Sequence, residues 1–145
     1  AEQLLKFVGD EVFAVFGAPL PVENHPQVAL ECAMEIQRCA PVLTQKLADM
    51  GIPPAHFGIG MNSGDVVAAH VGGGKRRQYD IVGDTVNIAS RIEGQAPAGG
   101  VAIGPNTKAL LPDAVTTPLG PLQLKGKQQP LQVHVLTSLQ RDSQV

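Results

Sequence analysis

The sequence predicts an α/β sandwich, in which a mostly antiparallel sheet carries its helices on one face. Three observations lead to this class. Short apolar segments are bounded by glycine-containing turns, as in strands. One long stripe of apolar residues recurs at helical spacing, and a shorter amphipathic segment follows later. In chain order the expected elements are ββαβββαβαββ, which form one sheet-and-helix domain over residues 1–145.

The chain is expected to open with a β-hairpin. Strands at 3–8 and 11–16 are separated by Gly9 and Asp10, and glycine suits the positive φ of a two-residue turn. Two interpretations of Asp10 stay open: its carboxylate satisfies its own turn, or it binds a metal ion. Lys6 is likewise either a strand-edge lysine whose ammonium reaches water or a donor to a ligand.

A long helix follows, capped by Asn24 or His25 and closed near Met50 with Gly51 as its C-cap. Pro41 is expected to kink or split it. Its apolar stripe consists of Ala29, Cys32, Ile36, Cys39, Leu43, Leu47 and Met50. The two cysteines are expected to be buried thiols, which is compatible with a reducing, cytoplasmic compartment.

The middle of the chain is expected to form a second hairpin from strands 56–61 and 65–71, joined at 62–64. A glycine-rich loop then carries the basic run 75–77, and a strand at 78–82 leads into a helix over about 85–94.

Asp84 is expected to cap that helix.

The C-terminal third is expected to contain a strand at 101–103, a short helix at 105–111, and two strands near 122–125 and 131–136.

Composition excludes several classes of function. The net charge of −2 argues against broad capture of nucleic acid, and the chain contains no apolar run of the roughly 20 residues that span a bilayer. No signal peptide, phosphate-binding glycine motif or nucleophile–histidine pair is recognisable. None of the histidines has metal-ligand spacing, so none is assigned a role; they are His25, His56, His70 and His134.

The most informative stretch is 75–91. Asp80 is an acid within an apolar strand and requires a partner if buried. Asn87 and Arg91 are four residues apart on the following helix and therefore share one face. An amide, a guanidinium and a carboxylate at one strand-to-helix corner suit a ligand with a base, a sugar and a phosphate. A solvated helix face is the alternative interpretation.

Three lysines extend this prediction. Lys6 as donor and Asp80 as acceptor could read the edge of a purine. Lys125 and Lys127, in Leu-Lys-Gly-Lys, suit a phosphate-contacting loop, although surface lysines are common.

Four motifs together resemble the catalytic domain of class III nucleotide cyclases, the adenylyl and guanylyl cyclase family. The motifs are KFVGDEVFAVFGAP (6–19), FGIGMNSGDVVA (57–68), YDIVGDTVNIASRIE (79–93) and LKGK (124–127). The resemblance implies a ferredoxin-like core. It also implies conversion of ATP to cyclic AMP and pyrophosphate, by attack of the ribose 3′-hydroxyl on the α-phosphorus with two Mg²⁺ or Mn²⁺ ions.

The resemblance implies a role for each matching residue. Lys6 and Asp80 would recognise adenine rather than guanine, and Asp10 would bind metal. Asn87 would position the ribose and Arg91 would stabilise charge on the α-phosphate. The residues implied near the phosphates are Phe7, Val8, Gly9 and Lys125, with Lys127 as an alternative to Lys125.

The resemblance further implies a head-to-tail homodimer with shared sites, in which the loop 72–79 is a dimerisation arm. A solvated surface is the alternative interpretation of its basic run 75–77. The family's first metal aspartate, first strand and first helices precede the position at which this chain begins. Their absence would expose interior sheet edges. It also keeps open a second function, a non-catalytic nucleotide-binding or regulatory module. Guanylyl specificity is disfavoured by Lys6 and Asp80.

Overall fold

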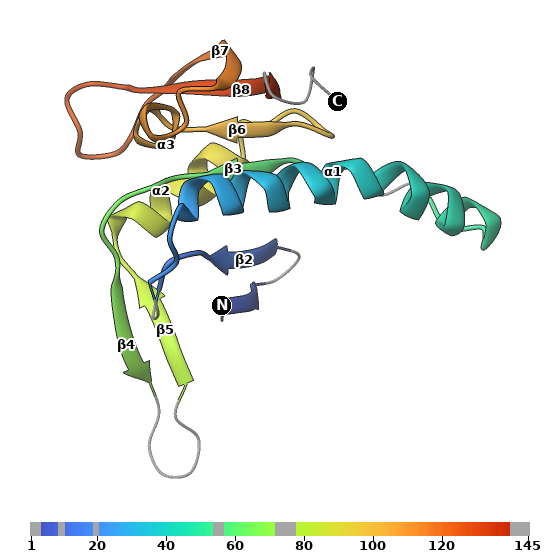
Figure 1. Cartoon of the computed structure of the whole chain (residues 1–145), viewed down its shortest axis with the longest axis horizontal. Coiled ribbons are helices and arrows are strands. Elements are labelled where there is room, and N and C mark those ends of the chain that lie inside the picture. The colour runs from blue at the N-terminus through green and yellow to red at the C-terminus, as the bar shows by residue number, and fades with distance from the viewer. Residues whose placement is uncertain (1–3, 9–10, 19–20, 54–56, 72–77, 140–145) are drawn as a thin grey trace.

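The computed structural model describes residues 4–8, 11–18, 21–53, 57–71 and 78–139 (Figure 1). Its element order is ββαβββαβαββ, as predicted, and the mixed α/β class with mostly antiparallel pairing is confirmed. The elements are β1 (Leu4–Val8), β2 (Glu11–Val15), α1 (His25–Asp49), β3 (Ile59–Met61), β4 (Val67–Val71), β5 (Gln78–Val82), α2 (Asp84–Glu93), β6 (Val101–Ile103), α3 (Pro105–Leu110), β7 (Ala114–Leu122) and β8 (Leu131–Leu139).

The strands of the described residues form three sheets. A four-stranded sheet has the order β3-β6-β8-β7, in which β3 and β6 are parallel and the other pairs are antiparallel. β1 pairs with β2, and β4 pairs with β5, as separate antiparallel hairpins. Figure 1 shows the β4–β5 hairpin projecting away from the four-stranded sheet. Within the described residues β3 is an edge strand of this sheet.

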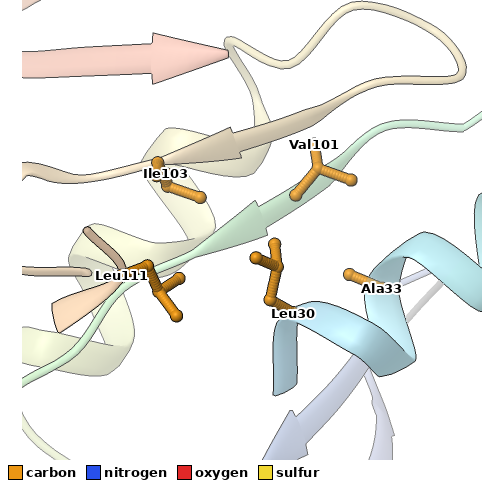
Figure 2. Close-up of a cluster of buried hydrophobic side chains, with 5 residues drawn as sticks. All are labelled: Leu30, Ala33, Val101, Ile103 and Leu111. Atoms are coloured by element: carbon orange, nitrogen blue, oxygen red, sulfur yellow. The ribbon is translucent and has the colours of Figure 1, made fainter. Parts of the chain in front are cut away.

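The two longer helices pack on opposite faces of the four-stranded sheet. In β6, Val101 and Ile103 join a buried cluster with Leu30 of α1 (Figure 2), whereas the intervening Ala102 joins a second cluster with Ile92 of α2. Successive side chains of a strand point to opposite faces. The expectation that helices cover a single face is therefore wrong, because β6 is apolar on both sides and each side requires a cover.

Helix α1 is continuous from His25 to Asp49, so Pro41 does not split it. Pro41 is exposed, where water can satisfy the carbonyl that loses its N–H partner. The helix ends in a Schellman motif, with Gly51 at φ +76° and hydrogen bonds from Gly51 N to Ala48 O (3.0 Å) and from Ile52 N to Leu47 O (2.8 Å). Within the described residues, no helix combines the length and apolar character needed to cross a membrane.

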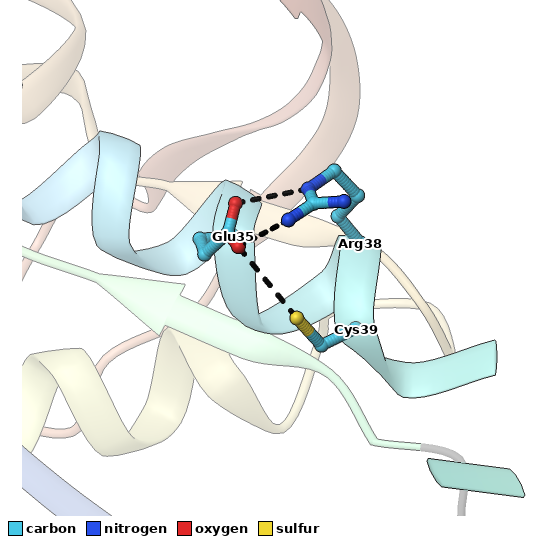
Figure 3. Close-up of polar contacts among 3 residues, drawn as sticks. All are labelled: Glu35, Arg38 and Cys39. Atoms are coloured by element: carbon cyan, nitrogen blue, oxygen red, sulfur yellow. Dashed lines mark hydrogen bonds and ion pairs between the residues drawn. The ribbon is translucent and has the colours of Figure 1, made fainter. Parts of the chain in front are cut away.

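The prediction of two buried thiols is wrong: Cys32 and Cys39 are both exposed. The buried face of α1 is formed by Leu30 and Ala33, which places the cysteines on its other side. Cys39 Sγ donates to Glu35 Oε1 at 3.7 Å, and Figure 3 shows this contact beside the Arg38–Glu35 ion pair. Hydrogen bonding to Arg38 holds the pKa of the Glu35 carboxyl below its ordinary value, but the pair is exposed and contributes little stability.

The predicted second hairpin is also wrong, because β3 pairs with β6 and β4 pairs with β5. The segment between β3 and β4 is instead held against the start of α2. Asn62 Nδ2 donates to Thr85 O at 3.0 Å, and Thr85 Oγ1 donates to Asp65 O at 2.7 Å. These bonds replace the local turn that the Asn-Ser-Gly sequence suggested.

The penultimate strand was predicted at 122–125, but β7 runs from Ala114 to Leu122 and ends where that strand was expected to begin. It contains Pro118 and Pro121 and, among the described strands, pairs only with β8, with register shifts near 115 and 118. Proline is confined to edge strands and bulges because it donates no backbone hydrogen bond. The two prolines therefore argued against a strand when only the sequence was read, although β7 tolerates them as an edge strand.

Gly60 generates the first testable prediction. A Cβ at this position of β3 would overlap the backbone of Glu93 in α2, whereas a Cβ at Gly94 would meet only ordinary contacts, 3.5 Å or more away. We expect Gly60→Ala to lower the free energy of unfolding by about 3 kcal/mol, since backbone must move to admit the methyl group. Gly94→Ala is the matched control, with a change of about +0.4 to +1 kcal/mol. Equal effects in urea unfolding would contradict the close packing of α2 on β3.

His134 generates the second testable prediction, which concerns the pH dependence of stability. Burial, with a smaller contribution from the charge of Lys108, lowers the pKa of this imidazole, and its buried Nδ1 atom has no hydrogen-bond partner among the described residues. The folded state therefore favours neutral His134, and this stabilisation is lost as the pH falls from about 6.5 through the lowered pKa. The free energy of unfolding should therefore change with pH in this range, with a slope of at most about 1.4 kcal/mol per pH unit from this histidine. We expect that slope to be smaller in His134→Gln.

The measurement is urea unfolding at several pH values, with His25→Gln at an exposed position as the control. An unchanged slope in His134→Gln would show that this histidine does not carry the pH dependence.

Candidate functional site

A cavity of about 170 Å³ lies between α2 and the segment that follows β7. It brings together Asn87, Arg91 and Lys125, three candidate residues that the sequence analysis took from two separate motifs. The complete lining is Asp84, Asn87, Ile88, Arg91, Leu124, Lys125 and Lys127. Apart from Ile88 and Leu124 these side chains are all polar or charged, with three cations and one carboxylate.

Helix α2 presents one wall of the cavity. Ile92 is fully buried against the four-stranded sheet and fixes the rotation of the helix, which leaves Asn87 and Arg91 exposed on a shared face. The N-cap is Gly83, at φ +143°, so the prediction that Asp84 caps α2 is wrong by one residue. Asp84 occupies the first helical turn, where a negative charge is favourable to the helix dipole.

The opposite wall is a tight turn over residues 124–127. Leu124 is 6% exposed and belongs to the same buried cluster as Ile92, so it anchors the turn to the core. Lys127 N donates to Leu124 O at 3.2 Å, and Gly126 has φ +81°, the third-position geometry of a type II turn. Lys125 therefore occupies the second position of the turn, one residue after a buried anchor.

Three polar contacts join and brace the two walls. Arg91 Nη2 donates to Gln123 O at 2.9 Å, and Gln123 Nε2 donates to Lys127 O at 3.2 Å. Lys127 Nζ lies 3.0 Å from Asp84 Oδ2, with the two side chains 49% and 66% exposed. Lys125 has no ion-pair partner within the part of the chain that the structure describes. The two candidate lysines thus differ: Lys127 has an ion-pair partner, and Lys125 has none among the described residues.

The structure places Asp80 apart from this cavity. It is half-buried on β5, opposite Ala69 of β4, and its Oδ1 accepts a hydrogen bond from Ile81 N at 3.0 Å. β5 leads directly through Gly83 into α2, so Asp80 lies upstream of the cavity on the same continuous strand-to-helix unit.

The candidates of the first hairpin are described only in part. Lys6, Phe7 and Val8 lie on β1, in a register that opposes Lys6 to Phe13. Gly9 and Asp10 lie outside the described residues, as do the basic run 75–77 and most of the expected dimerisation arm. Strand ends at Val8 and Glu11 agree with the predicted two-residue connection.

Metal binding is not supported by the described residues. Among them, no three His, Cys, Asp or Glu side chains gather in a group that could hold a metal ion. Asp10, the predicted metal ligand, is not among them, so its role stays a prediction.

Two contributors to the cavity were assigned no ligand role by the sequence analysis. Asp84 was expected only as a helix cap, and Gln123 acts through its backbone carbonyl, which carries no side-chain signal. The pairing of Asp84 with Lys127 spans more than forty residues of sequence and is visible only once the chain has folded.

Comparison with known proteins gives consistent matches. The family described as "Adenylate and Guanylate cyclase catalytic domain" matches residues 3–138. Adenylate cyclase 1 of Rhizobium meliloti (strain 1021) is 30% identical over 141 residues, which cover 95% of this chain but only 21% of that relative. The chain thus spans about a fifth of the relative's length.

Solved structures of both nucleotide specificities are similar to this chain. The guanylyl cyclase Cya2 superposes with a TM-score of 0.87 at 28% identity, covering 94% of this chain and 71% of that one. The adenylyl cyclase CyaB from P. aeruginosa superposes with a TM-score of 0.83 at 28% identity, covering 97% and 74% of the two chains.

Proposed function

The chain belongs to the adenylate and guanylate cyclase catalytic domain family, and we propose that it is the catalytic domain of an adenylyl cyclase, which converts ATP to 3′,5′-cyclic AMP and pyrophosphate. The resemblance recognised from the motifs is thereby confirmed at the level of the family. The choice of ATP over GTP, the metal ions, the dimer and a cytoplasmic location are parts of the proposal.

The observation that carries the proposal is the convergence of Asn87, Arg91 and Lys125 on one cavity. The reaction is intramolecular: a bond forms between the ribose O3′ and the α-phosphorus, the bond from the α-phosphorus to the pyrophosphate oxygen breaks, and the 3′-hydroxyl loses its proton. Such chemistry depends on positioning and on stabilising charge, which an amide and fixed cations can supply.

Each side chain has a task that matches its chemistry. Arg91 uses one N–H on Gln123 O and keeps its other donors for phosphate oxygens, where charge develops in the transition state. Asn87, one helical turn earlier on the same face, offers an amide to the ribose hydroxyls. Lys125, on the rigid turn, neutralises charge on the departing pyrophosphate.

The size of the cavity favours a site shared with a second protomer. Sites for drug-sized ligands typically enclose about 300–1,000 Å³, and this cavity measures about 170 Å³. It suits a phosphate group rather than a whole nucleotide, so other surfaces must enclose the base. A head-to-tail homodimer, in which Lys6 and Asp80 recognise the adenine, would supply them.

Metal ions belong to the proposal only through the family. The described residues do not fit a metal site, as reported above, and no step assigned to Asn87, Arg91 or Lys125 depends on one. Mg²⁺ or Mn²⁺ bound at Asp10, with a second carboxylate, remains the expectation from the resemblance.

The test is cyclic AMP formation from ATP and Mn²⁺ by the full-length protein that contains this chain. We expect Arg91→Ala to lower kcat about a hundredfold or more with a smaller change in KM, because its charge acts mainly in the transition state. Ser90→Ala, at an exposed neighbouring position of α2, is the matched control.

If the full-length protein binds a non-hydrolysable ATP analogue but forms no cyclic AMP from ATP, that result would contradict the catalytic proposal and support the non-catalytic module.

Base selection has its own prediction. The double substitution Lys6→Glu and Asp80→Cys should shift the ratio of kcat/KM for ATP over GTP toward GTP by about a hundredfold, because a donor and an acceptor that match adenine are removed. The ratio is measured with both nucleotides under the same conditions. Lys46→Glu, on the last turn of α1, is the control. An unchanged ratio would exclude these two residues as the adenine contacts.

A further inference from the structure

We propose that Asp84 is a positioning residue that sequesters Lys127, so that the cavity presents Arg91 and Lys125 as its phosphate-binding cations and holds pyrophosphate less tightly than it otherwise would. This inference rests on the proposed function, since it assigns the cavity to the phosphate end of the substrate. It concerns a pair of residues to which the sequence analysis gave no joint role.

The geometry distinguishes the two lysines. Lys127 Nζ is 3.0 Å from Asp84 Oδ2, across the cavity from the turn to the first turn of α2. Lys125 lines the same cavity and has no ion-pair partner among the described side chains. An incoming phosphate therefore meets an available ammonium at Lys125, whereas at Lys127 it must compete with a carboxylate already in place.

The pair is not required for the fold. Its side chains are 49% and 66% exposed, and exposed ion pairs typically contribute 0–1 kcal/mol. The turn is already fixed by buried Leu124, by the Lys127 N to Leu124 O hydrogen bond and by Gly126 at positive φ. The Asp84–Lys127 contact thus adds little stability, and its consequence is to set the charge that the cavity offers a ligand.

Limiting the cationic charge has a catalytic use. Pyrophosphate leaves the site in every turnover of the proposed reaction, and product release limits many enzymes. A third free cation would strengthen binding of substrate and product alike, which lowers KM without raising kcat. Asp84 therefore favours release of pyrophosphate.

The test measures pyrophosphate binding by calorimetry on the full-length protein. Asp84→Asn frees Lys127 and should tighten binding by roughly three- to tenfold, as one added charge-assisted contact would. Asp113→Asn removes the same charge from an exposed position that does not line the cavity and should change binding by less than about twofold, since water and salt screen an exposed charge that makes no contact with the ligand.

A cycle of substitutions tests whether the tighter pyrophosphate binding in Asp84→Asn is due to Lys127. Adding Lys127→Met to Asp84→Asn should abolish the tightening, and Lys125→Met should cost less in the Asp84→Asn protein than in the unaltered one, because Lys127 can then substitute. Circular dichroism and the thermal midpoint verify that each variant is folded. In the activity assay, Asp84→Asn should lower the pyrophosphate concentration at which cyclic AMP formation is half-inhibited.

Three results would overturn the proposal: no tightening in Asp84→Asn beyond that of Asp113→Asn, a gain that survives Lys127→Met, or no pyrophosphate binding by the unaltered protein. Failure of the proposed function is a separate outcome. A protein that makes no cyclic AMP but shows the expected binding cycle retains the Asp84 inference and loses the catalytic one.

Discussion

The close approach of α2 to β3 is the constraint on which the rest of the structure depends. Residue 60 has no side chain, and the backbone of Glu93 occupies the space that a Cβ would fill. This contact, with Ile92 buried beneath the helix, fixes both the height and the rotation of α2 over the four-stranded sheet. Asn87 and Arg91 stay exposed as a consequence, because the opposite side of α2 is committed to the core. The geometry of the cavity is therefore set by the packing of α2 on the sheet rather than by contacts among the polar groups that line the cavity.

The second wall of the cavity is fixed in the same way. Leu124 enters the cluster that contains Ile92, so one buried residue from the turn and one from the helix share the same core. Once both are seated, Lys125 faces α2 at the second position of a turn whose shape Gly126 permits. Hydrophobic burial supplies the energy, and the exposed Asp84–Lys127 pair, worth little by itself, then adjusts the charge of a cavity that already exists.

Local sequence patterns succeeded where the structural signal lies within one segment of the chain, and failed where it lies in contacts between distant segments. The order of elements and the bounds of β6 agree with expectation, because their periodicity and turn signals are local. The hairpin proposed around Asn62 was wrong because that side chain bonds to Thr85, more than twenty residues away. β7 was missed because Pro118 and Pro121 are tolerated only at an edge, and edge position is a property of the assembled sheet.

The sequence by itself determined the family, the order of the elements and the candidate residues Asn87, Arg91 and Lys125, because motif spacing and the 3.6-residue helical period are written in the chain. It also determined that Asn87 and Arg91 share a face. Only the tertiary structure decided that Lys125 joins them, that Lys127 is held by Asp84, and that the helices take opposite sides of β6. The reason is physical: these outcomes depend on contacts between segments distant in sequence, which form only when the apolar surfaces they share leave water.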